Sequence, residues 1–102
     1  TADRVADKPH PWPGFTLSVC QLRPESRGAI HIKSNIAADA PSIRANYLTK
    51  EEDWKCTLAG MRLAQSIANA KAMRDYTEAA YLPPHLVSSD DELKDYVREY
   101  SA

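Results

Sequence analysis

Two stretches of alternating apolar and polar residues lie on either side of a charged corner near the start of the chain. Residues 15–22 alternate with the period of two that is typical of a half-buried strand, and residues 29–33 alternate again. The corner between them, residues 23–28, contains a proline that lacks a backbone donor and Gly28, which permits a positive φ. The pattern therefore predicts a β-hairpin over residues 15–34.

A third short strand and a long helix are predicted after this hairpin. The strand follows Pro41, and the helix is expected from Thr49 to Arg74 or Asp75. The pair Thr49-x-x-Glu52 has the spacing of a capping box, in which each side chain bonds to the other residue's backbone N–H. The helix has apolar residues on two opposite sides, whereas a surface helix has a single apolar face. One side carries Leu58 and Met61, and the other carries Cys56, Leu63 and Ile67.

A second capping box, Ser89-x-x-Glu92, predicts a short C-terminal helix. Its apolar residues recur at i, i+3, i+4 and i+7, and they are Leu93, Tyr96, Val97 and Tyr100. Residues 1–14 contain three prolines and are expected to form an extended entry loop. The fold class is therefore α+β: an antiparallel sheet, made of the hairpin and a third strand, packed against one long and one short helix.

Length and charge exclude several classes of protein. A chain of 102 residues has room for one hydrophobic core. Thirteen basic and fourteen acidic residues give a net charge of −1, which leaves no electrostatic footprint for nucleic acid. The sequence contains no run of about 18 apolar residues, the length that a membrane-spanning helix requires. The chain has neither a signal-peptide profile nor an initiator methionine, so we expect a segment of a longer, cytoplasmic protein.

Histidines and cysteines are the first candidates for chemistry. His10, His31 and His85 lie far apart and have no cysteine or carboxylate at ligand spacing, which argues against a metal site. Cys20 and Cys56 could pair, but an isolated pair is weak evidence for a disulfide scaffold, and two reduced thiols are favoured.

The corner carries two arginines, Arg23 and Arg27, with Glu25 between them. Guanidinium groups bind phosphate in a bidentate manner, so one interpretation is an anion or flavin-phosphate contact. The other, which we favour, is a turn whose charges pair locally.

The ordered set of motifs resembles the C-terminal substrate domain of the glucose-methanol-choline (GMC) oxidoreductases, flavoenzymes that oxidise alcohols. The resemblance extends over residues 15–100 and includes the corner Arg23-Pro24-x-Ser26-Arg27-Gly28, then Pro41-x-Ile43, Asn46-Tyr47-Leu48 and the acidic helix start before Trp54. Members similar to choline dehydrogenase resemble the chain most. Residues 15–102 are thus expected to be part of that domain, ending before the family's His-Pro-x-Gly motif.

The resemblance implies a parent enzyme that binds FAD and transfers hydride from an alcohol, while this segment covers the substrate cavity. The sequence His10-Pro11-Trp12-Pro13-Gly14 is not the family's catalytic motif, because the histidine and glycine are one residue too far apart. We therefore expect no catalytic, cofactor-binding or metal-binding residue here, and an isolated segment that is inactive and self-associates. The partners expected are the rest of the parent enzyme and a small alcohol. The alternative is a free-standing α+β binding module.

Overall fold

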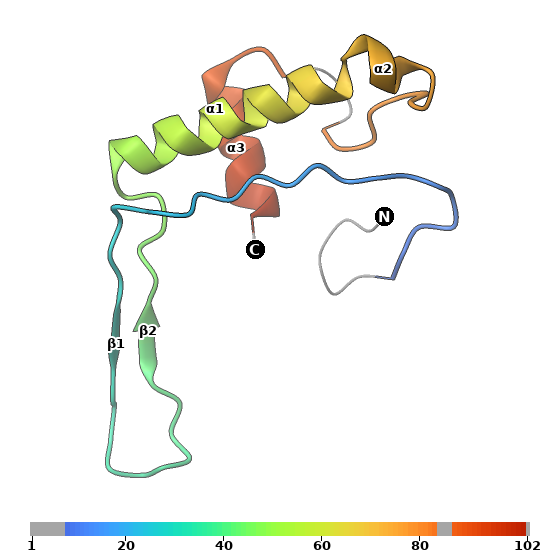
Figure 1. The fold of residues 1–102 in the computed structure, drawn as a ribbon. Coiled ribbons are helices and arrows are strands. Elements are labelled where there is room, and N and C mark those ends of the chain that lie inside the picture. Colours follow the sequence, from blue (N-terminus) through green and yellow to red (C-terminus); the bar gives the residue numbers. More distant parts are fainter. Residues whose placement is uncertain (1–7, 84–86, 102) are drawn as a thin grey trace. The chain divides into compact units, whose positions relative to one another are not determined.

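The computed structural model describes residues 8–83 and 87–101, and it confirms the α+β class. The elements in chain order are β1 (Ala29–His31), β2 (Ser42–Arg44), α1 (Glu51–Ala68), α2 (Lys71–Arg74) and α3 (Asp90–Tyr100) (Figure 1). The chain forms two compact units, one of residues Gln21–Cys56 and one of Thr1–Cys20 with Thr57–Ala102. The boundary between the units falls inside α1. Each unit is described separately below.

The unit Gln21–Cys56 contains a two-stranded antiparallel sheet of β1 and β2. In its register Ile30 lies opposite Ile43 and His31 lies opposite Ser42. Because side chains alternate between the two faces of a strand, the two isoleucines share one face and the polar pair shares the other. Ile30 and Ile43 are 69% and 66% exposed. The sheet was expected to pack against a helix, and in the part of the chain described here these two side chains are not covered.

The predicted hairpin is wrong in its strand pairing. Residues 15–22 form no strand, and β1 pairs instead with the following strand, β2. The ten residues between His31 and Ser42 turn the chain back, so the sheet has two strands where three were expected. The period-two pattern identified residues that adopt extended backbone, but it could not identify which segment pairs with which.

The long helix ends earlier than the apolar pattern suggests. α1 stops at Ala68, and Ala70 is extended, with φ −61° and ψ 146°, before α2 begins. The Asn69 side chain donates to the Gln65 carbonyl at 2.8 Å, and the Arg74 side chain donates to the Asn69 carbonyl at 3.2 Å. These side chains occupy carbonyl groups at the helix end, where intrahelical partners run out. The residues from Lys71 onward therefore form a separate short helix.

The small core of the unit made of Thr1–Cys20 and Thr57–Ala102 lies between α1 and α3. Leu58, Val87 and Leu93 are buried together, and Met61 packs against them. Arg62 of α1 forms an ion pair with Asp90 and donates to the Ser88 carbonyl at 3.1 Å, which joins the two helices at the start of α3. The predicted two-faced character of α1 is confirmed, because Leu63 and Ile67 are 62% and 45% exposed.

The capping box of the C-terminal helix is confirmed in its serine half, while the Glu92 carboxylate bonds to the Ser89 hydroxyl and not to the Ser89 backbone N–H. The Glu92 backbone N–H donates to the Ser89 hydroxyl at 3.2 Å, and that hydroxyl lies 3.2 Å from the Glu92 carboxylate. Leu93 and Val97 are buried, as the apolar stripe predicts, and the rings of Tyr96 and Tyr100 stack with their centroids 4.8 Å apart. None of the helices in residues 8–83 and 87–101 is both long and apolar enough to cross a bilayer.

Candidate functional site

The most densely hydrogen-bonded site in the unit Gln21–Cys56 is a carboxylate that holds the charged corner, and we call it the Asp53 clamp. Asp53, in the first turn of α1, accepts bonds from the backbone N–H groups of Glu25 and Ser26, each at 2.8 Å. It also accepts from the Gln21 amide at 2.9 Å and from the Ser26 hydroxyl. One carboxylate therefore binds two residues of the corner and Gln21 just before it.

Asp53 is 1% exposed and is the one buried charged side chain among the described residues. A buried charge is expensive unless it is hydrogen-bonded, and here the corner supplies those bonds. The Ser26 hydroxyl, and then the Glu25 N–H, hold the pKa of Asp53 well below its usual range, and burial opposes them only partly. The group is therefore a stable anion, which makes it unsuited to exchanging protons near neutral pH.

Ser26 completes the clamp by capping the approach to α1. Its hydroxyl accepts from the backbone N–H groups of Thr49 at 3.0 Å and Lys50 at 3.2 Å. The predicted capping role of Thr49 is wrong, because the Thr49 hydroxyl donates to the Asn46 carbonyl at 3.1 Å. A serine from the corner, more than twenty residues away in sequence, thus accepts the bond from the Thr49 N–H that the local motif assigned to Glu52.

Gly28 is required for a different reason from the one predicted. None of the glycines in the described chain has a positive φ. A Cβ on Gly28 would instead lie against the backbone oxygens of Arg44 and Ala45, 2.5 Å from the latter. The corner therefore needs a glycine because the chain after β2 passes directly over it.

The Asn46-Tyr47-Leu48 motif is a turn that connects β2 to α1. Asn46 and Leu48 have positive φ values of 51° and 55°. Asparagine tolerates this conformation, and its amide donates to the Arg27 carbonyl at 3.2 Å, but leucine adopts it at a cost of about 1–2 kcal/mol. The clamp, which holds Thr49 and Lys50 just after the turn, keeps Leu48 in this strained conformation.

Arg27 bonds within its own turn, as the favoured interpretation expects, but it does so without pairing with the opposite charge. Its guanidinium donates to the carbonyls of Pro24 at 2.6 Å and Ser26 at 2.9 Å. The partners are backbone carbonyls and not Glu25. Arg27 is therefore part of the turn itself.

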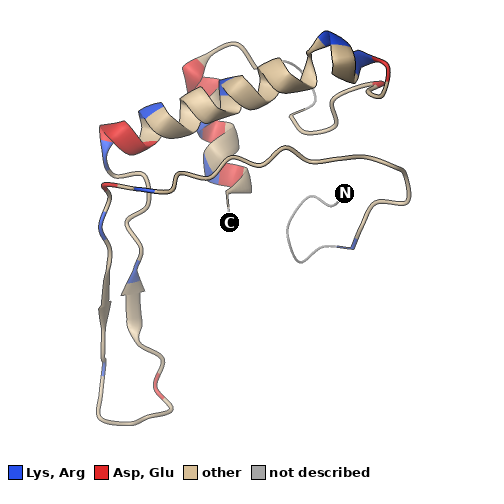
Figure 2. Cartoon of the chain, in the orientation of Figure 1, with Lys and Arg blue, Asp and Glu red and all other residues tan. Residues whose placement is uncertain are grey.

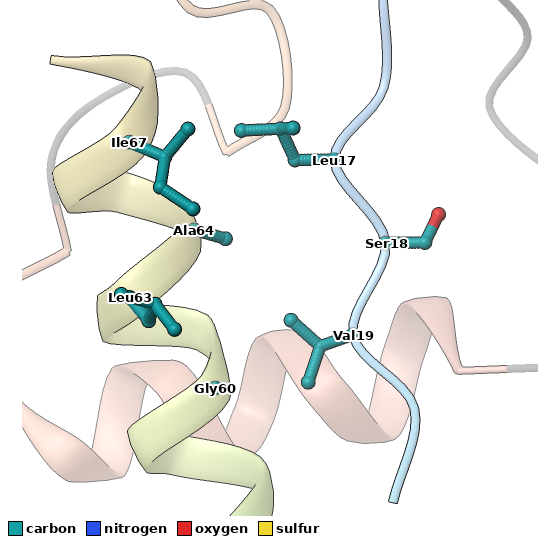
Figure 3. Close-up of a pocket in the computed structure, with 7 residues that line it drawn as sticks. All are labelled: Leu17, Ser18, Val19, Gly60, Leu63, Ala64 and Ile67. Carbon is teal, nitrogen blue, oxygen red and sulfur yellow. The ribbon is translucent and has the colours of Figure 1, made fainter. Parts of the chain in front are cut away.

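A separate, apolar feature lies in the other unit, between residues 15–20 and α1. It is a groove of about 250 Å³. Figure 3 shows Leu17 and Val19 pointing toward α1 and Ser18 pointing away. The α1 wall of this groove is made of Gly60, Leu63, Ala64 and Ile67. A Cβ on Gly60 would collide with a methyl group of Val19, so the missing side chain lets the segment approach the helix. The volume is below the range of about 300–1,000 Å³ that is typical of ligand pockets.

The remaining candidates are dispersed. His10 stacks on Trp12, with ring centroids 4.6 Å apart, and meets the edge of Tyr81, while His31 lies exposed on β1. His85 lies outside the described residues. Cys20 and Cys56 do not form a disulfide with each other, as favoured. Over residues 8–83 and 87–101, no three side chains of the types that bind metals lie together.

The starts of α1 and α3, and Arg27, do not fit the phosphates of a flavin dinucleotide. Helix N-termini bind phosphate through free N–H groups and the positive end of the helix dipole. Figure 2 shows acidic residues at the starts of α1 and α3, and these are Glu51, Glu52 and Asp53 in the first and Asp90, Asp91 and Glu92 in the second. These carboxylates repel phosphate, and Arg27 already bonds to its own turn.

Sequence reasoning missed the clamp, although it singled out most of the residues around it. The sequence places Asp53 only in the acidic helix start before Trp54, and Ser26 only in the corner motif. The available signal was the pairing of an acidic first turn with a corner that exposes two N–H groups. No linear spacing connects residues 27 positions apart.

Comparison with known proteins identifies the family. Residues 24–102 match the family model described as GMC oxidoreductase. The chain is 40% identical over 80 residues to an alcohol dehydrogenase [acceptor] of Pseudomonas putida, which is 78% of this chain and 14% of that protein. It is 36% identical over 88 residues to an oxygen-dependent choline dehydrogenase of Pseudomonas aeruginosa (strain LESB58), and 38% identical over 85 residues to one of Staphylococcus aureus (strain JH9).

These two choline dehydrogenase matches cover 86% and 83% of the chain, but 16% and 15% of the relatives. The chain thus spans about one sixth of the length of the curated relatives it matches. No solved structure matches it significantly. The family model covers 79 consecutive residues of the chain, and these include the clamp and the turn described above. The chain therefore belongs to the GMC oxidoreductase family and is similar to choline dehydrogenases.

Proposed function

We propose that this chain forms part of the domain that shapes the substrate cavity of an FAD-dependent oxidoreductase acting on alcohols. Support comes from the family and from relatives whose names are alcohol dehydrogenase and choline dehydrogenase. The proposed contribution is architectural. The chain shapes and covers the substrate cavity, while the flavin and the catalytic base belong to other parts of the enzyme.

The Asp53 clamp is the observation that carries this proposal. It lies within the family match, and its polar groups already bond to one another. A general base must have a pKa near the working pH and a free lone pair toward the substrate. Asp53 has neither property, because its pKa is held low by Ser26 and Glu25, which occupy its oxygens. The hydrogen bonds of the clamp therefore hold the backbone of the corner in place and leave no group for catalysis.

A chimera provides the test. Residues 24–102 would replace the matching segment of the Pseudomonas putida alcohol dehydrogenase, and bound flavin and its reduction by an alcohol would be measured by absorbance. We expect the chimera to bind FAD and to retain alcohol-dependent reduction. The isolated 102-residue chain, titrated with FAD in parallel, is expected to leave the flavin spectrum unchanged.

Two variants of the chimera separate architecture from catalysis. His31→Ala, which changes the exposed histidine of the sheet, should leave the rate of flavin reduction within about two-fold. Asp53→Ala should lower the yield of flavin-loaded protein, because the corner loses its acceptor. A folded, flavin-loaded His31→Ala chimera with a hundred-fold slower rate would contradict the proposal, since general bases contribute about 10²–10⁴-fold.

Self-association of the isolated chain is also part of the proposal. Its support is the apolar surface that each unit leaves exposed, which includes Ile30 and Ile43 on the sheet and Leu63 on α1. The cytoplasmic location expected from the sequence stays a prediction.

A further inference from the structure

We propose that Tyr47 is a preorganised anchor through which this segment docks on the rest of its parent polypeptide, an inference that rests on the proposed function. Tyr47 lies in the turn between β2 and α1 (Figure 1) and is 81% exposed. Its two neighbours, Asn46 and Leu48, both have positive φ values. The turn therefore combines backbone strain with an aromatic side chain that is exposed to solvent.

Hydrogen bonds hold the backbone on both sides of Tyr47. Before it, the Asn46 amide donates to the Arg27 carbonyl at 3.2 Å. After it, the Thr49 N–H donates to the Ser26 hydroxyl at 3.0 Å. The Thr49 hydroxyl donates to the Asn46 carbonyl at 3.1 Å and so closes the turn across Tyr47. The backbone of Tyr47 is therefore fixed before any partner binds.

A simple connection between β2 and α1 would not require the strain at Leu48. Glycine adopts a positive φ readily, whereas leucine adopts it at an energetic cost. Backbone strain of this kind concentrates at functional sites, where the surrounding structure maintains it. Leu48 itself is half-buried and contributes to packing, so Tyr47 is the exposed side chain that the strained turn presents.

A fixed and exposed tyrosine has the properties of an interface anchor. Tyrosine is one of the residue types that carry most of the binding energy at protein interfaces. It also provides a large contact area while losing little side-chain freedom, because only two torsions need to be fixed. A backbone that is already ordered removes a further cost of binding. Tyr76, which is 84% exposed, lies after α2 and outside the clamp, and it serves as the matched control.

The length of the relatives indicates what covers Tyr47. The chain corresponds to 14% and 16% of the alcohol dehydrogenase and choline dehydrogenase that it matches. A parent of similar length has most of its residues outside this segment, and a larger protein buries a larger fraction of its surface. We therefore assign the contact of Tyr47 to that remaining polypeptide. A contact with the alcohol is the competing assignment, and the third experiment distinguishes the two.

Backbone ¹⁵N relaxation of the 102-residue chain tests the preorganisation. The order parameter of the Tyr47 N–H should be about 0.85, the value of rigid backbone. Asp53→Asn, which weakens the clamp, should lower the order parameter of Tyr47 and leave that of Tyr76 unchanged. A Tyr47 order parameter below about 0.6 in the unmodified chain would overturn the inference.

Nitration with tetranitromethane tests the burial of Tyr47. The rate at each tyrosine would be followed by peptide mass spectrometry in the isolated chain and in the flavin-loaded chimera described above. We expect Tyr47 to react at least ten-fold more slowly in the chimera than in the isolated chain, and we expect less protection of Tyr76. Equal rates for Tyr47 in the two proteins would overturn the inference.

Substitution in both proteins separates an anchor from a structural residue. Tyr47→Ala should leave the urea midpoint of the isolated chain unchanged, because the side chain is exposed there. In the chimera it should accelerate flavin release on heating at least ten-fold, and Tyr47→Phe should stay within two-fold of the unsubstituted chimera, because the ring makes the contact. Tyr76→Ala should change the rate of release less than two-fold.

Three results would overturn the assignment of Tyr47. These are an unchanged rate of flavin release in Tyr47→Ala, an equal acceleration in Tyr76→Ala, and a raised KM for the alcohol with unchanged flavin release, which would place Tyr47 against the substrate. An unsubstituted chimera that binds flavin but is not reduced by an alcohol would contradict the proposed function instead.

Discussion

Replacing Gly60 by alanine sets helix propensity against packing, and the structure predicts which effect wins. Gly60 lies inside α1, where alanine is favoured over glycine by about 0.8–1 kcal/mol. Judged by the helix alone, Gly60→Ala should therefore stabilise the chain. The new Cβ, however, would collide with a methyl group of Val19.

The magnitude of the collision follows from what can move. The other Val19 carbons near the new Cβ would be at 3.6 Å, an ordinary contact, so the conflict involves a single methyl group. A β-branched side chain is stiff at χ1 and cannot easily rotate that methyl away. Overpacking of this kind costs about 1–3 kcal/mol, which exceeds the propensity gain. We expect Gly60→Ala to lower the free energy of unfolding by up to about 2 kcal/mol.

A double-mutant cycle measures the effect. Urea unfolding followed by circular dichroism would be recorded for the parent chain, Gly60→Ala, Val19→Ala and the double variant. In the Val19→Ala background the methyl is absent, so Gly60→Ala should become stabilising by about 1 kcal/mol. Ser66→Ala, at an exposed position of α1, is the control, and it should stabilise both backgrounds equally.

The sign change is the decisive observation. If Gly60→Ala stabilises the parent chain as much as it stabilises the Val19→Ala chain, the segment does not lie against the helix as described. The groove between this segment and α1 would then not exist as described.

Three further substitutions test the clamp, the corner and the core. Because the pKa of Asp53 is lowered in the folded state, its stabilising contribution is present above about pH 4 and is lost as the pH falls below it. Asp53→Asn should therefore flatten the dependence of the urea midpoint on pH between 7 and 3, and an unchanged dependence would contradict the clamp. Gly28→Ala and Gly28→Asn should destabilise alike by about 1–3 kcal/mol, since space and not φ is limiting; tolerance of asparagine alone would restore the positive-φ explanation. Leu93→Ala, at a residue that is 0% exposed, should lower the free energy of unfolding by about 2–5 kcal/mol, and a loss below 1 kcal/mol would place Leu93 outside the core.

The two capping boxes show how far local sequence can be trusted. Ser89 caps α3 as the spacing of Ser89-x-x-Glu92 predicts, because its own hydroxyl accepts from the Glu92 N–H. Thr49-x-x-Glu52 has the same spacing, yet Ser26 bonds to the N–H groups before α1. A capping motif indicates which local side chain is able to cap a helix. Whether that side chain or one from a distant segment bonds to the N–H groups depends on the tertiary structure.

The family could be identified from the sequence because it depends on the order and identity of residues along the chain. The two apolar sides of α1 and the buried stripe of α3 were also predictable, since a helix repeats every 3.6 residues wherever it lies. These features are local, and they depend on spacings of three or four residues.

Only the tertiary structure decided which strands pair and what holds the corner. Alternation predicts that a segment is extended, but it does not determine which strand it pairs with. In the structure β1 pairs with β2 and not with residues 15–22. The Asp53 clamp and the need for Gly28 arise from residues far apart in sequence that fold against one another. The physical reason is the same in each case: hydrogen bonds and close contacts depend on distance in space, which linear spacing beyond one helical turn does not encode.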